Sequence, residues 1–140
     1  ASADAPEATM TDEPIRSFEE FWPYYVGEHR NPINRGLHYL GTSMALGAVA
    51  TAAVTRNPKW LLAAPVLGYG PAWVGHFFLE QNKPATFDYP LWSLMADFKM
   101  LGLAVRGRMA DEVTRLYGSP NPPADAPLVS ERPRASATAV

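Results

Sequence analysis

The sequence predicts an all-α protein built on an integral membrane two-helix hairpin, flanked by interfacial amphipathic helices and by disordered polar termini. Two uncharged runs, residues 36–55 and 60–79, are each long enough for a helix to cross a hydrocarbon core of about 30 Å. A polar turn at residues 56–59 separates them. A buried hairpin in a soluble protein is the alternative, but little amphipathic sequence remains to cover two wholly apolar helices.

Composition restricts the chemistry that the chain can perform. Its 140 residues suit one domain, and 12 Lys+Arg against 14 Asp+Glu provide no basic footprint for nucleic acid. The chain has no cysteine, which excludes disulfides, thiolate nucleophiles and cysteine-ligated metals. Histidine and carboxylate side chains are therefore the expected reactive groups.

Both ends of the chain differ from its middle. Residues 1–14 carry four acids, no base and no apolar run, and residues 119–140 are rich in proline and alanine. Such compositions bury too little apolar surface to offset chain entropy, so we expect two disordered tails. The remaining residues, 15–118, form the predicted membrane-embedded helical domain.

Two shorter helices are expected beside the hairpin. Ser17 is a suitable N-cap for a helix whose aromatic side chains are typical of a membrane interface. Residues 91–105 carry an apolar stripe at helical spacing, which favours a helix lying along the interface. Lysines and arginines are more numerous beyond the hairpin ends than in its turn. This bias predicts a bacterial inner-membrane protein with both termini cytoplasmic.

The hairpin geometry places two of the three histidines at one depth. In an antiparallel pair closed at Asn57, residues whose numbers sum to about 114 lie side by side, as His38 and His76 do. Asn34 and Glu80 obey the same rule, about one helical turn further from the hairpin tip. The expected arrangement is a histidine layer next to an Asn/Glu layer.

A metal site is the hypothesis that these residues favour. The break at Asn31-Pro32 allows His29 to fold back over the other two histidines. Ionisable groups within membrane spans are costly and are functional candidates by default. We therefore predict His29, His38, His76 and Glu80 as metal ligands and catalytic residues, with Glu80 as fourth ligand or as an orienting residue. Fe(II) suits this set, and Zn(II) fits the same residue types.

Other interpretations of these residues remain open. Histidines at span ends also hydrogen-bond to water or across helices. A bis-histidine haem site could use His38 and His76, although it would leave His29 and Glu80 unexplained. We predict Asn34 and Arg35 as substrate-binding residues, because a guanidinium matches a carboxylate in a bidentate fork. Simple anchoring at the cytoplasmic membrane surface is the alternative for Arg35.

Two motifs give the chain a family resemblance. The first is His29-x-Asn31-Pro32-x-Asn34-Arg35-x-x-His38-Tyr39-x-Gly41, and the second is Trp73-x-Gly75-His76-x-x-x-Glu80-x-x-x-Pro84-Ala85. Together they resemble the membrane family of the fungal endoplasmic-reticulum 2-hydroxy-palmitic-acid dioxygenase and its bacterial homologues, formerly a domain of unknown function. The resemblance extends over residues 18–108. Fungal relatives tend to have paired histidines where this chain has Glu28-His29.

The resemblance implies an Fe(II)-dependent enzyme of fatty-acid α-oxidation that uses O₂ to shorten a 2-hydroxy fatty acid by one carbon. His29, His38 and His76 would occupy the family's histidine positions. Membrane lipids, the 2-hydroxy fatty acid and O₂ are then the expected partners, with a homo-oligomer or a larger membrane complex as further options. The competing hypothesis is a non-catalytic small membrane subunit that packs against a larger complex through small residues such as Gly41 and Ala48. A lipid- or haem-binding module is a third.

Overall fold

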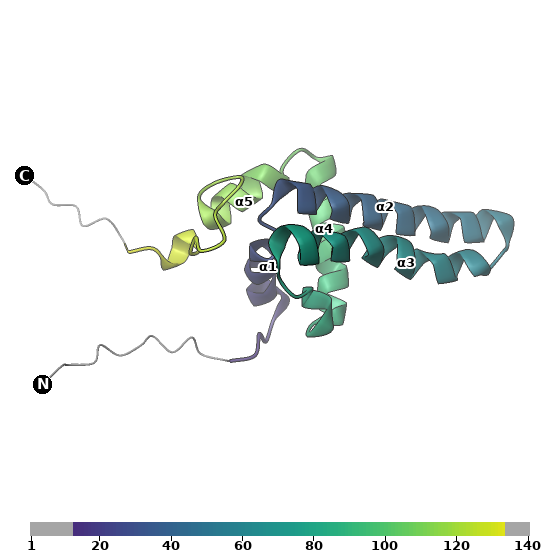
Figure 1. Cartoon of the computed structure of the whole chain (residues 1–140), viewed down its shortest axis with the longest axis horizontal. Helices are drawn as coiled ribbons and strands as arrows, with labels where there is room; N and C mark the ends of the chain where they lie inside the picture. Colours follow the sequence, from purple (N-terminus) through teal and green to yellow (C-terminus); the bar gives the residue numbers. More distant parts are fainter. Residues whose placement is uncertain (1–12, 134–140) are drawn as a thin grey trace, which may run out of the picture.

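The computed structural model describes residues 13–133, which form helices and loops with no strand among them (Figure 1). The all-α prediction is therefore confirmed. The α-helices are α1 (Phe18–Gly27), α2 (Pro32–Thr55), α3 (Lys59–Val74), α4 (Pro90–Val105) and α5 (Met109–Tyr117). Three short turns complete the described chain: the π-helical turn η1 (Gly75–Glu80) and the 3-10 turns η2 (Ala85–Phe87) and η3 (Val129–Glu131).

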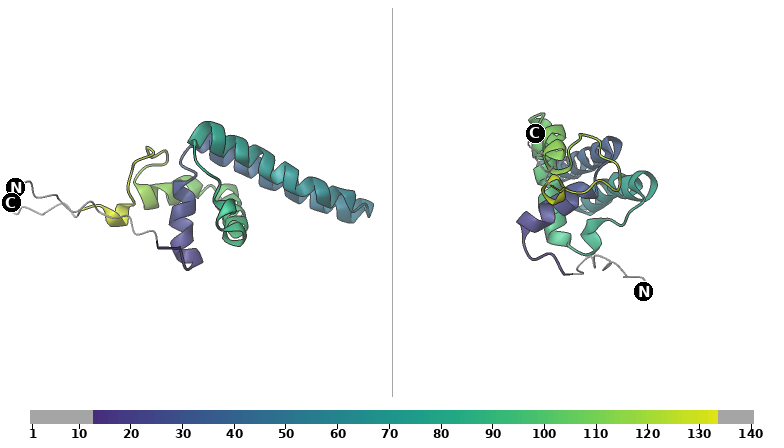
Figure 2. Two further views of the ribbon diagram at one scale, coloured as in Figure 1. Left: turned by 60° about the horizontal axis from the view of Figure 1, so that its bottom comes forward. Right: turned by 90° about the vertical axis from the view of Figure 1, so that its left-hand side faces the viewer.

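Helices α2 and α3 form a long antiparallel hairpin that projects from a base made by α1, α4 and α5 (Figures 1 and 2). Asn31 caps α2 by accepting a hydrogen bond from the Ile33 N–H at 2.8 Å, and Pro32 supplies the first turn. Small residues let the two helices approach closely. A Cβ on Gly41 would lie only 2.5 Å from the Gly68 carbonyl oxygen. The small-residue face of α2 is therefore packed against α3 within the hairpin.

The two helices of the hairpin differ in whether they are long and apolar enough to span a membrane. Within residues 13–133, α2 alone is long and apolar enough to cross a membrane. The predicted second span, residues 60–79, is divided between the sixteen-residue α3 and the π-helical turn η1. The hairpin is thus present, whereas insertion of both helices stays a prediction.

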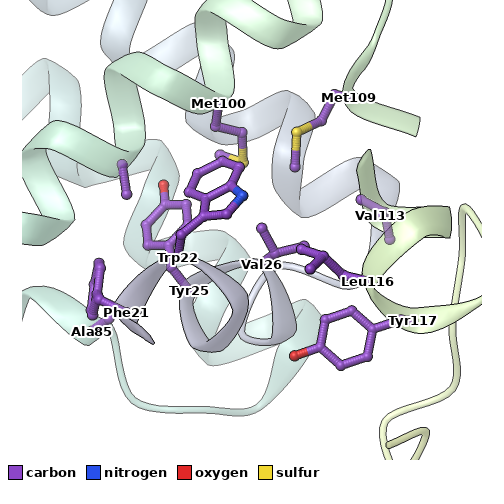
Figure 3. Close-up of a cluster of buried hydrophobic side chains, with 11 residues drawn as sticks. Phe21, Trp22, Tyr25, Val26, Ala85, Met100, Met109, Val113, Leu116 and Tyr117 are labelled. Atoms are coloured by element: carbon purple, nitrogen blue, oxygen red, sulfur yellow. The ribbon is translucent and has the colours of Figure 1, made fainter. Parts of the chain in front are cut away.

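The hydrophobic core lies at the base and not in the hairpin (Figure 3). Helix α1 contributes Phe21, Trp22, Tyr25 and Val26, which pack against methionines of α4 and α5 and against the inner face of α5. We expected the α1 aromatics to lie in a membrane interface. Three of them are instead almost fully buried, because α4 and α5 both pack against α1.

Helix α4 buries one face and turns several large apolar side chains of its other face outward. Ser93, Ala96 and Met100 are buried, whereas the exposed large side chains of this helix include Leu91, Leu94, Met95 and Phe98. An outward apolar stripe is the arrangement expected of a helix that lies against lipid.

The chain after α5 makes hydrogen bonds with the base of the fold. Arg30 donates hydrogen bonds to the carbonyl oxygens of Pro123 and Ala126, at 2.6 and 2.9 Å. Arg132 donates to the Tyr117 carbonyl at 2.6 Å. The Arg30 guanidinium thus uses carbonyl acceptors of the proline-rich segment, whereas Arg132 uses the last carbonyl of α5. The predicted tail 119–140 therefore has defined contacts over residues 119–133, whereas residues 134–140 and most of the predicted tail 1–14 lie outside the described residues.

Candidate metal centre

Three buried histidines meet where the hairpin joins the base. His29 follows α1, His38 lies on α2 and His76 lies in the π-helical turn η1. Their ring centroids are 4.3, 4.6 and 4.8 Å apart, and each pair of rings meets nearly at right angles. The predicted proximity of His38 and His76 is confirmed, and so is the folding back of His29.

One nitrogen of each ring is held by an oxygen acceptor. The His29 Nδ1 donates to the Tyr25 carbonyl at 2.6 Å, and the His38 Nδ1 donates to the Asn34 carbonyl at 3.0 Å. The His76 Nδ1 donates to the side-chain oxygen of Asn82 at 2.7 Å. Since these oxygens accept and do not donate, all three imidazoles carry their proton on Nδ1.

This tautomer leaves three Nε2 lone pairs without a proton. The Nε2 atoms of His29 and His38 lie 2.9 Å apart, and one nitrogen from each of the three residues lies within 4.8 Å of the others. Two facing lone pairs at that distance repel one another unless a cation or a proton lies between them. The donor set therefore fits a metal ion, and imidazole suits Fe, Zn, Cu and Ni alike.

Burial keeps this cluster neutral and ready to coordinate. Desolvation, reinforced by the neighbouring His38 and His76 rings, lowers the pKa of the His29 imidazole well below its usual 6.5. The His29 ring also stacks on Tyr25, with centroids 4.1 Å apart. The nitrogen that a metal would bind is thus unprotonated at neutral pH.

Glu80 has partners that lie beside the histidine cluster and not inside it. One of its carboxylate oxygens accepts from the Asn31 backbone N–H at 2.5 Å and from the Asn34 amide at 3.3 Å. The predicted Asn34/Glu80 layer is therefore present. Glu80 lies outside the three-histidine group and contacts Asn34, whose carbonyl oxygen accepts from His38. The two roles considered for Glu80 stay predictions.

The predicted substrate-binding pair is occupied with internal contacts. Asn34 is completely buried against Glu80. Arg35 is buried as well, and its guanidinium donates to the carbonyl oxygens of His29, Arg30 and Pro120 at 2.8 to 3.0 Å. The structure thus uses both side chains to hold the centre together.

Asn82 is the site residue that the sequence did not reveal. Its amide nitrogen donates to the Glu28 carbonyl at 3.0 Å and to the Glu28 carboxylate at 2.6 Å, which turns its oxygen toward His76. The π-helical turn and the left-handed Gln81 (φ 55°) bring Asn82 back to this position. π-Helical turns are frequent at functional sites because they re-aim side chains.

Asp97 of α4 stands near the cluster but outside it. It accepts a hydrogen bond from the Tyr25 hydroxyl. Burial raises the pKa of the Asp97 carboxyl to about 6, partly offset by that hydroxyl. Tyr25 therefore connects Asp97 to the cluster, because its hydroxyl binds Asp97 and its carbonyl oxygen binds His29.

The fold and the site together define an all-helical protein with a buried three-histidine cluster able to bind a metal. Residues 15–109 match the family described as 2-hydroxy-palmitic acid dioxygenase Mpo1-like. The chain belongs to this family, whose name indicates a dioxygenase, and thus O₂ and a lipid substrate in general terms. Neither the comparison with curated proteins nor that with solved structures gave a match.

Proposed function

We propose that this chain is an Fe(II)-dependent dioxygenase that acts on 2-hydroxy fatty acids at a membrane surface and shortens them by one carbon. The observation that supports this most is the group of three buried imidazoles, in which one nitrogen of each residue lies within 4.8 Å of the others and each Nδ1 is held by an oxygen acceptor. The family description supplies the reaction class and the substrate class.

The protein's own part in this chemistry is orientation and exclusion of water. Bound iron would supply the reactivity toward O₂ that side chains lack. The carbonyl oxygens of Tyr25 and Asn34 and the amide of Asn82 hold the three rings in place. Glu80 in turn holds Asn34. Three neutral imidazoles leave the positive charge of the ion uncompensated, which favours an anionic ligand such as a 2-hydroxy acid.

The membrane location is part of the proposal. Large apolar side chains are exposed along the outer surface of the hairpin and on the stripe of α4. Soluble monomers rarely expose contiguous apolar surface of this extent. We place the hairpin in a bilayer, taken to be a bacterial inner membrane with the termini on the cytoplasmic side, so that the centre lies where acyl tails meet their polar heads.

The geometry disfavours two of the competing hypotheses, the docking subunit and the bis-histidine haem site. A subunit that docks onto a larger complex through Gly41 and Ala48 would need those residues exposed, yet both are buried. A bis-histidine haem would need room for a porphyrin. The cavity beside His29 and His76 measures only about 20 Å³.

Metal analysis of the detergent-purified protein tests the proposal. We expect iron in the wild type, near one ion per chain, and its loss in His76→Ala and in His38→Ala. Asn121→Ala, an exposed position in the C-terminal segment, is the control and should keep its iron. A wild type without any transition metal, or equal metal in His76→Ala, would contradict the metal centre, whereas zinc alone would contradict only the iron assignment.

Turnover is tested separately by O₂ consumption. The iron-loaded wild type should consume O₂ with 2-hydroxypalmitic acid and release a product one carbon shorter, whereas His76→Ala should not. An iron-containing wild type that consumes no O₂ with any 2-hydroxy fatty acid would overturn the enzymatic proposal and leave a metal-binding membrane protein.

A further inference from the structure

Helix α4 directs two polar side chains toward the histidines, and the metal centre as described leaves their function open. Ser93 is 4 % exposed, and its hydroxyl oxygen has no hydrogen-bond partner among residues 13–133. Asp97 lies four residues further on, hence on the same face of the helix. Within the part of the chain that the structure describes, only its Oδ1 has a hydrogen-bond partner, the Tyr25 hydroxyl. A buried, unpartnered hydroxyl is costly unless something binds to it.

Both side chains line a small cavity beside the histidines. This space of about 20 Å³ is bounded by His29 and His76 on one side and by Ser93 and Asp97 on the other. Its size suits one group comparable to a water molecule. A hydroxyl or a single carboxylate oxygen therefore fits between α4 and the centre.

A larger apolar groove adjoins this small cavity. It measures about 350 Å³ and runs between α2, α3 and α4, with Thr42, Val49, Leu61 and Phe98 among its lining residues. That volume falls within the roughly 300–1,000 Å³ of small-molecule pockets. Asp97 and Tyr69 line both this groove and the small cavity. A molecule with an apolar tail and a polar head can therefore occupy both spaces at once.

We propose that Asp97 and Ser93 recognise the 2-hydroxy acid head of the substrate while the groove between α2, α3 and α4 holds its acyl tail. This inference rests on the proposed function and names the residues that select its substrate. The 2-hydroxyl group enters the small cavity, where it donates its hydrogen bond to the free oxygen of Asp97 and accepts one from the Ser93 hydroxyl. Apart from Thr42, Tyr69 and Asp97, the side chains that line the groove are apolar.

The proposal predicts discrimination between acids with and without the hydroxyl group. A site built to hydrogen-bond a hydroxyl rejects the analogue that lacks it, because its own polar group is left unpaired. Binding of 2-hydroxypalmitic and palmitic acid is measured anaerobically by calorimetry, with the purified protein in detergent. The wild type should bind the hydroxy acid at least about tenfold more tightly.

Variants of α4 separate this contact from chelation by a metal. In Asp97→Asn, and independently in Ser93→Ala, the preference should fall several-fold while metal content stays at the wild-type level. Asp111→Asn, an exposed carboxylate on α5, makes the same chemical change as a control and should keep the preference. An unchanged preference in both α4 variants, or no preference in the wild type, would overturn the inference. Should Asp97→Asn fail to fold, Ser93→Ala decides alone.

A second pair of variants tests the groove. Val49→Trp would fill it, whereas Val54→Trp, at a position 85 % exposed beyond the groove, is the matched control. Val49→Trp should shift binding toward shorter 2-hydroxy acids, and Val54→Trp should bind like the wild type. Equal chain-length preference in both would place the tail elsewhere. The protein could bind no metal and show no turnover, and still bind the acids with the expected hydroxyl and chain-length preferences. That result would refute the proposed function but support this subsite.

Discussion

Gly75 lies directly against the side chain of Asn34, so that a Cβ added to Gly75 would fall 1.8 Å from the Asn34 oxygen and 3.4 Å from its Cα. Asn34 cannot move aside freely, because its amide binds Glu80 and its carbonyl holds His38. The contact between the second half of the hairpin and the first is therefore set by the absence of a side chain at position 75.

Gly75→Ala should accordingly damage both the hairpin and the metal centre. Overpacking of this kind typically costs about 1–3 kcal/mol of unfolding free energy, and displacement of Asn34 should also weaken metal binding through His38. Gly70→Ala is the matched control, because a Cβ there meets nothing within 4 Å and alanine favours a helix by about 1 kcal/mol. Thermal unfolding and metal content measure both effects, and equal stability of the two variants would refute the packing argument.

Asn82→Ala should weaken metal binding without removing a ligand. Loss of the residue that orients a metal-bound histidine typically lowers metal affinity about 10–100-fold. The measurement is competition for Fe(II) or Co(II) against a chelator of known affinity. Asn121→Ala should match the wild type. Unchanged affinity in Asn82→Ala would mean that the π-helical turn alone positions His76.

The buried carboxyl of Asp97 should make stability depend on pH. Its pKa is about 6 in the folded protein against 3.8 ordinarily, so the folded state keeps a proton that the unfolded chain loses as pH rises between these values. The stability that this proton provides is complete below pH 3.8 and is lost as pH rises toward 6, by about 3 kcal/mol. Asp97→Asn should not show this loss. The difference in denaturation free energy between wild type and variant, followed from pH 4 to pH 7, checks the sign.

The absence of cysteine permits a direct test of membrane placement with single-cysteine variants. In reconstituted vesicles, Leu62→Cys on the hairpin and Leu91→Cys on α4 should resist a membrane-impermeant maleimide, because both positions carry exposed apolar side chains that we assign to lipid. Thr114→Cys, an exposed position on α5, should react. All three should react in denaturant. Equal labelling of Leu62→Cys and Thr114→Cys in intact vesicles would place the hairpin in water.

The sequence was sufficient to predict the hairpin and the histidine cluster because both depend on simple spacing. The position of the turn at Asn57 determines which residues of the two helices lie at one depth, and His38 and His76 follow from it. His29 follows from the break before Pro32. None of these predictions needed knowledge of side-chain packing.

The surroundings of the cluster could not be read from spacing in the same way. Asn82 reaches His76 only because a π-helical turn and a left-handed residue interrupt the regular helix, and no periodic pattern announces such a turn. Arg35 resembled a carboxylate-binding residue, yet its partners are main-chain carbonyls supplied in part by Pro120, 85 positions away. The burial of Trp22 likewise depends on α5, a short helix whose packing the sequence pattern did not indicate.

All three histidines of the chain belong to the one cluster. Isotope-labelled histidine would therefore give a nuclear magnetic resonance spectrum in which every imidazole signal comes from the candidate centre, with no background from elsewhere in the protein. The protonation of each ring and its response to added metal or fatty acid could then be followed in the native chain, without any substitution.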